Sequence, residues 1–429
     1  MRIVQGFLYE EVRAIESYYS KMHSNAENAM LAKNVKKFTF DCRRYAWQRI
    51  HSGQRTTSIS IPGHVGKPAL ENIKNVRELR IVEWSNPKYS SPCRTPKPTD
   101  WLSIINNAVP GSRNEFAFLK HLAIYSAYVS VQDLLPVFRI PSLLKLTLHG
   151  AYQPFPLENW TIPQSSCNLK ELHLLDCFIN SPALAQVLLI MRGLKKLDYQ
   201  YSTRNWEPLG PIDKPKTYWA YHTWNVVGDA LRTQKQSLQF ISLEDFSDQE
   251  LIKIVYPQGR DIGKLGSFKD FPKLQSLKAP IDAILDLDAG EDNLAVYLPS
   301  HLSEFKTKLS PKDTVAPLCT SIIWSIHHVL GSGSNKVLGL SFERDFPFRQ
   351  CRLSRLLHDL TRAGIDVRPS WYRKTGPELE FLLATIRWME SAEYNVDLGD
   401  ELDDDYIAYD DADDLFERYW FAGLSNFRD

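Results

Sequence analysis

The sequence predicts an α/β fold in which short parallel strands follow one another along an irregular, curved solenoid. Three observations predict it: an apolar pattern that recurs along the chain, a nearly constant interval between its central copies, and helix-like segments between those copies. In such a solenoid the curved parallel sheet lines the concave side and helices lie on the convex side. A helical cap is expected to close the C-terminal end.

The recurring pattern is L-x-x-L-x-L, and its four clearest copies follow one another in the middle of the chain. They begin at Leu119, Leu143, Leu169 and Leu194, so successive copies are 24, 26 and 25 residues apart. Leucine is common and a single copy carries little information, whereas four copies at this spacing define a period. That period is typical of leucine-rich repeats.

Weaker copies flank this block and extend the predicted leucine-rich-repeat domain over residues 31–370. They begin at Val35, Val76, Leu238, Leu274 and Val337, with a further candidate at Leu302 and Phe305. Most of these wider intervals are 36 to 44 residues, which leaves room for longer connections. Outside the repeats we expect an N-terminal helical cap at 1–30, a C-terminal capping helix at 371–396 and an acidic-aromatic tail at 397–429.

The segment NLKELHLLDCFI (168–179) is the most complete copy and indicates how one unit folds. Counted from Leu169 as position 1, a short strand turns positions 4 and 6 toward the core and positions 3, 5 and 7 toward the opposite face. Position 9 is Cys177, where a tightly packed side chain helps the chain to turn inward. We therefore interpret Cys177 as a buried structural residue, because a reactive thiol needs exposure and a neighbouring base.

Segments between the copies have helical periodicity. Residues 180–193 are expected to form a helix with Ser181 as its N-cap, a proline in its first turn and Gly193 as its stop signal. Residues 129–138 and 224–234 are expected to be helical as well. A proline inside the first of these two segments should make that helix short or kinked.

The candidate partner-binding residues are those at positions 3, 5 and 7 of the central strands, because the concave face is built from them. They are Tyr125, Lys145, His149, Glu171, His173, Lys196, Asp198, Gln200, Phe240 and Glu244. Such a mixture of bases, acids, histidines and aromatic groups suits the recognition of a protein. We therefore predict a non-enzymatic protein-binding scaffold. For any single residue the alternative is a strand side chain that is merely solvated.

Motifs of the common catalytic and cofactor-binding sites are not found in the sequence. There is no P-loop, no G-x-G-x-x-G after a strand and no G-x-S-x-G nucleophile elbow. The six cysteines form no C-x-x-C pair and have no clear metal-ligand spacing with histidine. We expect no catalytic residue, no metal and no cofactor, and the alternative is an enzyme site grafted on the repeats.

Charge is distributed unevenly, although the formal net charge is zero. Residues 397–429 contain twelve acidic and two basic residues, so the rest of the chain is basic. This tail is interpreted either as a solvated segment or as one that docks on the basic body or on a basic partner. The Lys and Arg residues of the body are dispersed along the sequence, so a nucleic-acid partner is not expected.

The chain has the features of an intracellular protein. It contains no run of about 18 apolar residues, so no membrane span is expected. Its first residues, MRIVQGFLYEEVRAIE, are not typical of a secretory signal. A cytoplasmic or nuclear location with reduced cysteines follows as an expectation.

Two further segments carry a resemblance to a known family. They are YWAYHTWNVVGDALRTQKQSLQFISL (218–243) and LGSFKDFPKLQSLKAPID (265–282), in which an aromatic-Pro turn leads into a leucine strand. Together with the repeats, they resemble the leucine-rich-repeat region of fungal F-box-type proteins. The resemblance implies an alternative function as the substrate-recognition subunit of an SCF-type ubiquitin ligase, with a ligase adaptor as partner. Residues 1–34 contain no Leu-Pro opening and are too short for an F-box. The expectation is that an F-box was lost, that the chain is a truncated form, or that the protein never had one.

Overall fold

In the computed structural model the chain forms two compact units, Met1–Phe305 and Lys306–Asp429. The structure describes residues 11–15, 36–41, 75–82, 101–106, 116–126, 129–202, 223–246, 263–286, 293–309, 336–342, 360–362 and 364–371. Among the helices of these residues, none is long and apolar enough to cross a membrane.

A parallel sheet forms the first unit, and its strands lie in the order in which they occur in the chain. They are β1 (Glu11–Ile15), β2 (Lys37–Asp41), β3 (Glu78–Val82), β4 (His121–Tyr125), β5 (Lys145–His149), β7 (Glu171–Ile179), β8 (Lys196–Ser202), β9 (Phe240–Phe246) and β10 (Ser276–Lys278). Every neighbouring pair in this series is parallel. A short strand, β6 (Tyr152–Gln153), pairs with β7 away from this path. The predicted α/β class with a parallel sheet is confirmed.

One hydrogen-bonding contact is repeated where the strands begin. The carbonyl of the residue before a strand accepts bonds from two successive backbone N–H groups at the start of the next strand, at 2.8–3.1 Å. The accepting carbonyls belong to Lys36, Arg77, Lys120, Leu144, Lys170, Lys195, Gln239 and Gln275. Each carbonyl oxygen uses both of its lone pairs in this contact. The contact is the same whether the connection is short, as between β4 and β5, or long, as between β8 and β9.

The core is made of the apolar residues predicted at positions 1, 4 and 6. Those of the seven copies that begin at Val76, Leu119, Leu143, Leu169, Leu194, Leu238 and Leu274 are at most 2% exposed. They include Val76, Leu79, Ile81, Leu119, Leu122, Ile124, Leu143, Leu146, Leu148, Leu169, Leu172, Leu174, Leu194, Leu197, Tyr199, Leu238, Ile241, Leu243, Leu274, Leu277 and Ala279. Full burial of a large apolar side chain stabilises a fold by roughly 1.5–3 kcal/mol. Each of these seven copies therefore contributes buried apolar side chains to the core. The copy predicted at Val337 does not follow this pattern, because Val337 is half-buried and Leu338 and Leu340 are buried.

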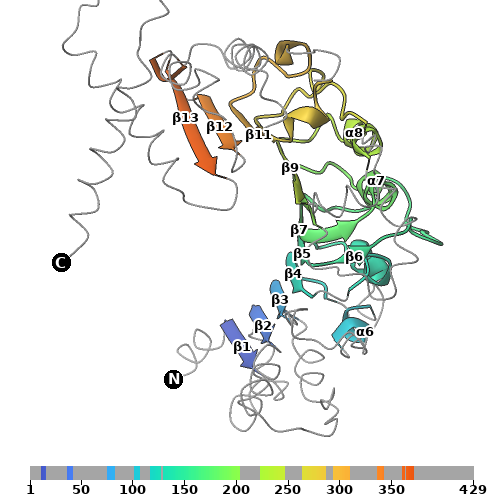
Figure 1. Ribbon diagram of the computed structural model, residues 1–429. Helices are drawn as coiled ribbons and strands as arrows, with labels where there is room; N and C mark the ends of the chain where they lie inside the picture. Colours follow the sequence, from blue (N-terminus) through green and yellow to red (C-terminus); the bar gives the residue numbers. More distant parts are fainter. Residues whose placement is uncertain are drawn as a thin grey trace, which may run out of the picture. The chain divides into compact units, whose positions relative to one another are not determined.

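Helices and short 3-10 turns connect the strands. They are α6 (Trp101–Asn106), η2 (Gln132–Arg139), α7 (Ser181–Leu189), α8 (Trp224–Arg232), η5 (Ile281–Ala283) and η6 (Leu294–Val296). Figure 1 shows α6, α7 and α8 on the same side of the strands. The helix predicted at 224–234 is α8. The helix predicted at 129–138 is the 3-10 segment η2, which contains Pro136.

Helix α7 confirms the helix predicted at 180–193 but corrects its cap. The Oδ1 atom of Asn180 accepts a bond from the Ala183 N–H group at 2.7 Å, so Asn180 is the N-cap. The expected cap, Ser181, instead accepts a bond at its Oγ from the N–H of Thr223 at 2.8 Å. Ser181 thus links α7 to the residue that precedes α8. Gly193, the expected stop, follows the helix with a φ of 79°.

The N-terminal helical cap predicted at 1–30 is contradicted at residues 11–15, and the rest of this range lies outside the described residues. Residues 11–15 form β1 instead. The backbone of β1 lies in register with β2, so that Val12 is aligned with Phe38 and Ala14 with Phe40. The alternation of polar and apolar residues in EVRAI fits a strand that adds one further strand to the sheet.

The second unit contains a parallel pair of strands, β12 (Lys336–Phe342) and β13 (Ile365–Trp371). A helical segment at 360–362 precedes β13, and Gly364 has a φ of 82°, as expected for the glycine that ends a helix. Strand β11 (Glu304–Leu309) begins in the first unit. The predicted capping helix at 371–396 begins on the last residue of β13, and its remainder lies outside the described residues, as does the tail at 397–429.

Replacement of Asn180 by Ala should destabilise the first unit. The change removes the cap of α7 and the buried bond that the Asn180 amide donates to the Pro154 carbonyl at 2.7 Å. Loss of an N-cap costs roughly 1–2 kcal/mol, and loss of a buried partner adds to this. Urea unfolding followed by circular dichroism measures the change. The control Asn168→Ala removes an exposed bond to Pro141 and should change the free energy of unfolding by less than about 0.5 kcal/mol.

Gly228→Ala should also destabilise the fold, although alanine is the better helix former by roughly 1 kcal/mol. Helix α8 approaches Leu265 so closely that a Cβ atom on Gly228 would lie 2.0 Å from the Leu265 carbonyl oxygen. Overpacking of this kind costs roughly 1–3 kcal/mol. The sign of the change in unfolding free energy decides between the two effects, and a more stable variant would contradict the close approach.

Candidate functional site

The candidate site is the face of the sheet opposite to its buried side chains. We call the residues at positions 3, 5 and 7 of β4, β5, β7, β8 and β9, together with those at positions 3 and 5 of β3 and β10, the open strand face. All ten predicted partner-binding residues lie on it, and all but His173 are exposed or half-buried. The structure therefore brings the predicted residues together on one surface. Whether that surface binds a partner stays a prediction.

Parallel pairing arranges these residues in rows across the strands. The row at position 3 contains Glu78, His121, Lys145, Glu171, Lys196, Phe240 and Ser276. The row at position 5 contains Arg80, Ala123, Thr147, His173, Asp198, Ser242 and Lys278. Neighbouring strands in a sheet are about 4.8 Å apart, so charged side chains in one row can interact directly.

A chain of charged groups crosses the middle of the open strand face. Lys145 Nζ lies 3.1 Å from Glu171 Oε2, and the same oxygen lies 3.4 Å from His173 Nε2. The other ring nitrogen, His173 Nδ1, lies 3.6 Å from Asp198 Oδ2. His173 is only 8% exposed, so its ring is held between the two carboxylates. We call Lys145, Glu171, His173 and Asp198 the charged bridge.

Both carboxyl groups of the charged bridge are held in their ionised form. Burial is the largest influence on each pKa and acts to raise it, because it disfavours the charged form. For Glu171, hydrogen bonds and charges from Lys145 and His173 outweigh burial and lower its pKa. For Asp198, hydrogen bonds from His173 and Ser242 and nearby positive charges also give a lowered pKa. Glu171 and Asp198 therefore present negative charges near neutral pH.

An aromatic and cationic cluster lies next to the charged bridge. The rings of Tyr125 and His149 stack with their centroids 5.7 Å apart. The guanidinium of Arg80 lies over the Tyr125 ring, 4.5 Å from its centroid. Burial lowers the pKa of His149, against an opposing effect of Asp176, so this ring favours the neutral form. The cluster offers a partner a flat aromatic surface with a positive charge on one side.

Glu244 is the centre of a third polar group on the open strand face. Its Oε2 atom lies 2.8 Å from Lys278 Nζ, and its Oε1 accepts a bond from the Gln200 amide at 3.3 Å. Gln200 and Glu244 face one another in the β8–β9 register. Gln200 and Glu244, which are both predicted site residues, are thus joined by a hydrogen bond between β8 and β9.

At the end of β7, the repeat positions counted from Leu169 no longer match those of β8, because the register between the two strands changes. The register shifts after Leu174, which pairs with Tyr199, so that Cys177 pairs with Tyr201. Strand β7 therefore contains one residue more than β8 in this stretch, and Asp176 has a φ of 50°. Such a bulge lets Cys177 return to the core, where it is fully buried.

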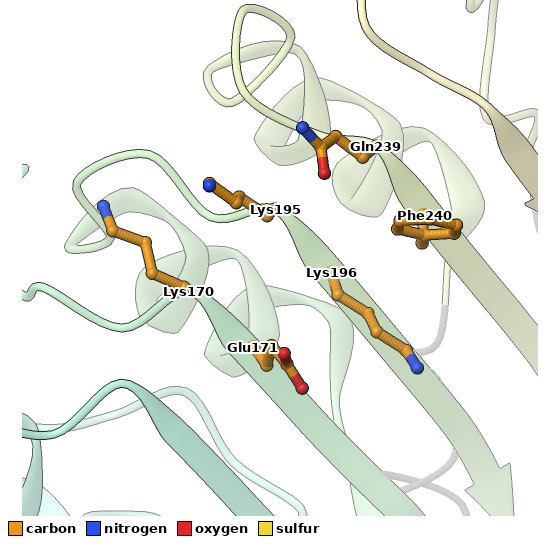
Figure 2. A pocket seen from close by; sticks show the side chains of 6 residues that line it. All are labelled: Lys170, Glu171, Lys195, Lys196, Gln239 and Phe240. Carbon is orange, nitrogen blue, oxygen red and sulfur yellow. The ribbon is translucent and has the colours of Figure 1, made fainter. Parts of the chain in front are cut away.

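A shallow pocket of about 290 Å³ lies where β7, β8 and β9 begin. The sequence pattern did not predict this pocket. The pocket is lined by Lys170, Glu171, Lys195, Lys196, Gln239 and Phe240 (Figure 2). Glu171, Lys196 and Phe240 are predicted site residues at position 3. The other three side chains precede their strands at position 2. Lys170, Lys195 and Gln239 could have been found in the sequence, because position 2 directly precedes position 3 of the open strand face in every copy.

Comparison with known proteins identifies no relative. No protein family, no curated protein and no solved structure matches the chain. Among the residues that the structure describes, no group of three or more His, Cys, Asp or Glu side chains could hold a metal ion. The open strand face is therefore the feature of the described residues that points to a function.

Cys177 should be unreactive while the protein is folded. Burial raises the pKa of its thiol to about 12, and the Sγ atom donates to the carbonyl of Leu175 at 3.2 Å. At about pH 8 only roughly one thiol in ten thousand is then ionised. Iodoacetamide labelling followed by peptide mass spectrometry should modify Cys177 in urea and not in the native protein. Rapid native labelling would contradict the buried structural role.

The stability contributed by Asp198 should depend on pH. Its folded-state pKa lies below the ordinary value of 3.8, so its carboxylate stabilises the fold above that value. The contribution is lost as the pH falls through the lower folded-state pKa. Unfolding titrations should therefore show a larger stability gap between the wild type and Asp198→Asn at about pH 5 than at about pH 3. A gap that grows toward low pH would show the opposite linkage.

Proposed function

We propose that the chain is a leucine-rich-repeat scaffold that binds a protein partner on its open strand face. The observation that carries this proposal is the alternation along each strand. Positions 4 and 6 are buried in the core, whereas positions 3, 5 and 7 present mostly polar and aromatic groups in aligned rows, with Ala123 and Leu175 as aliphatic exceptions. The assignment to leucine-rich repeats is supported by the spacing of the copies and by the repeated carbonyl contact before each strand.

The composition of the open strand face favours a protein partner. Tyr and Arg are among the side chains that most often dominate binding energy at protein interfaces, and Tyr125 and Arg80 lie together here. Acids and bases of the charged bridge alternate over three neighbouring strands. A protein surface can match such an arrangement with complementary charges, which provides specificity.

Rigidity of the face also supports this proposal. The polar side chains are carried by strands, and their contacts restrict them before a partner arrives. His173, for example, touches a carboxylate on its own strand and another on β8. Side chains that are already ordered lose less conformational entropy on binding, so more of the interaction energy appears as affinity.

A variant that truncates the exposed aromatic and polar groups tests the proposal. Tyr125→Ala, His149→Ala and Gln200→Ala are combined, and proteins captured from a lysate by the intact chain are quantified by mass spectrometry. Loss of one interface hot spot weakens binding by roughly 2 kcal/mol or more, about 30-fold in Kd, so specific partners should disappear.

The matched control carries Phe155→Ala and Val296→Ala, which truncate exposed apolar side chains outside the open strand face. It should capture the same partners as the wild type, and circular dichroism confirms that both variants are folded. Equal capture of every partner by the face variant and the wild type would refute binding through this face.

A further inference from the structure

Basic side chains gather along the edge of the sheet where the strands begin. Before the six strands β2, β3, β4, β5, β7 and β8, position 2 is basic in five cases and leucine in one. The basic residues are Lys36, Arg77, Lys120, Lys170 and Lys195. They are far apart in the sequence, but the repeated carbonyl contact aligns their backbones at one position per strand. We call this row the leading edge.

At the C-terminal half of this edge the basic side chains border the shallow pocket. Figure 2 shows Lys170 and Lys195 at the starts of β7 and β8, with Lys196 one residue farther along its strand. The exposed ring of Phe240, 38% accessible, lies on β9 beside them. The pocket therefore combines three ammonium groups with one apolar surface.

The positive charge in the pocket is only partly compensated. Its one carboxylate, Glu171, is already engaged by Lys145 and His173. The Lys170 ammonium donates to the backbone carbonyls of Arg192 and Gly193, which are neutral acceptors. Lys195 forms no ion pair within the part of the chain that the structure describes. A ligand with carboxylates would supply the missing negative charge.

A protein segment fits this edge better than a nucleic-acid strand. The adjoining row at position 3 contains two carboxylates, Glu78 and Glu171, among its basic residues. A continuous polyanion would bring phosphates close to these carboxylates, whereas a peptide can place its acids only where lysines lie. A peptide can also place an apolar side chain on Phe240, which burial of apolar area favours.

We infer that the leading edge at β7 and β8, together with the start of β9, binds a short acidic segment of a partner protein. Its carboxylates lie against Lys170, Lys195 and Lys196, and an apolar side chain of the segment covers Phe240. This inference rests on the proposed function, because it names the chemistry of the partner that the adjoining open strand face recognises.

Fluorescence anisotropy with labelled peptides tests the inference on the full chain. The first peptide carries glutamates on both sides of a central leucine. A second has alanine in place of the leucine, and a third has glutamine in place of each glutamate. The first should bind most tightly, and its affinity should fall as salt is added, because salt screens exposed charges. The Lys195→Gln and Lys196→Gln double variant should weaken binding roughly tenfold, which corresponds to about 1.4 kcal/mol.

The control double variant, Arg139→Gln and Lys264→Gln, removes the same charge from the connections to β5 and β10 and should bind within about twofold of the wild type. Equal weakening by both double variants would reduce the effect to net charge and overturn the inference. Tighter, lysine-dependent binding of a single-stranded oligonucleotide would overturn it in favour of nucleic acid.

The outcome is separable from that of the proposed function. If the open-face variant loses its partners but no acidic peptide binds, the leading-edge inference fails and the proposed function stands. If the peptide binds through Lys195 and Lys196 while the open-face variant keeps every partner, the proposed function fails and the edge site stands.

Discussion

The first unit depends on the backbone carbonyl that precedes each strand and accepts two N–H groups from the next. This contact fixes the register of neighbouring strands, and a shift of one residue would turn every side chain to the opposite face. It recurs from Lys36 to Gln275 across connections of very different length. Loop length has only a weak effect on closure entropy, so the chain can vary its connections while the strands stay aligned. Both the core and the polar rows follow from this alignment.

Much of the sheet could be predicted because the apolar pattern of each copy is short and local, and it predicts one strand by itself. Leu169, Leu172 and Leu174 predict a strand and its buried face from the local sequence alone, without reference to the neighbouring units. Features that depend on a choice between competing contacts could not be predicted in this way. Asn180 and Ser181 can both cap a helix, and the structure uses Ser181 to bind Thr223 instead. The extra residue in β7 is likewise visible only against β8.

The candidate site shows the same division between pattern and contact. Placement of Tyr125, His173 and the other predicted residues on one face follows from the alternation of strand side chains. The position of His173 between two carboxylates depends on the pairing of β7 with β8, which the sequence does not state. The leading-edge lysines are dispersed in the sequence because their spacing is that of the repeat. Folding converts this spacing into adjacency, and so a basic edge arises without a basic block.

Hydroxyl-radical footprinting of the free chain and of its complex with a captured partner tests the central claim most directly. Phe240 on the open strand face and Phe155 outside it are matched probes, with exposed fractions of 38% and 46%. The account predicts that complex formation protects Phe240 and the Tyr125–His149 pair from oxidation and leaves Phe155 unchanged. Protection of Phe155 with unchanged oxidation of Phe240 and Tyr125 would place the partner elsewhere and contradict it.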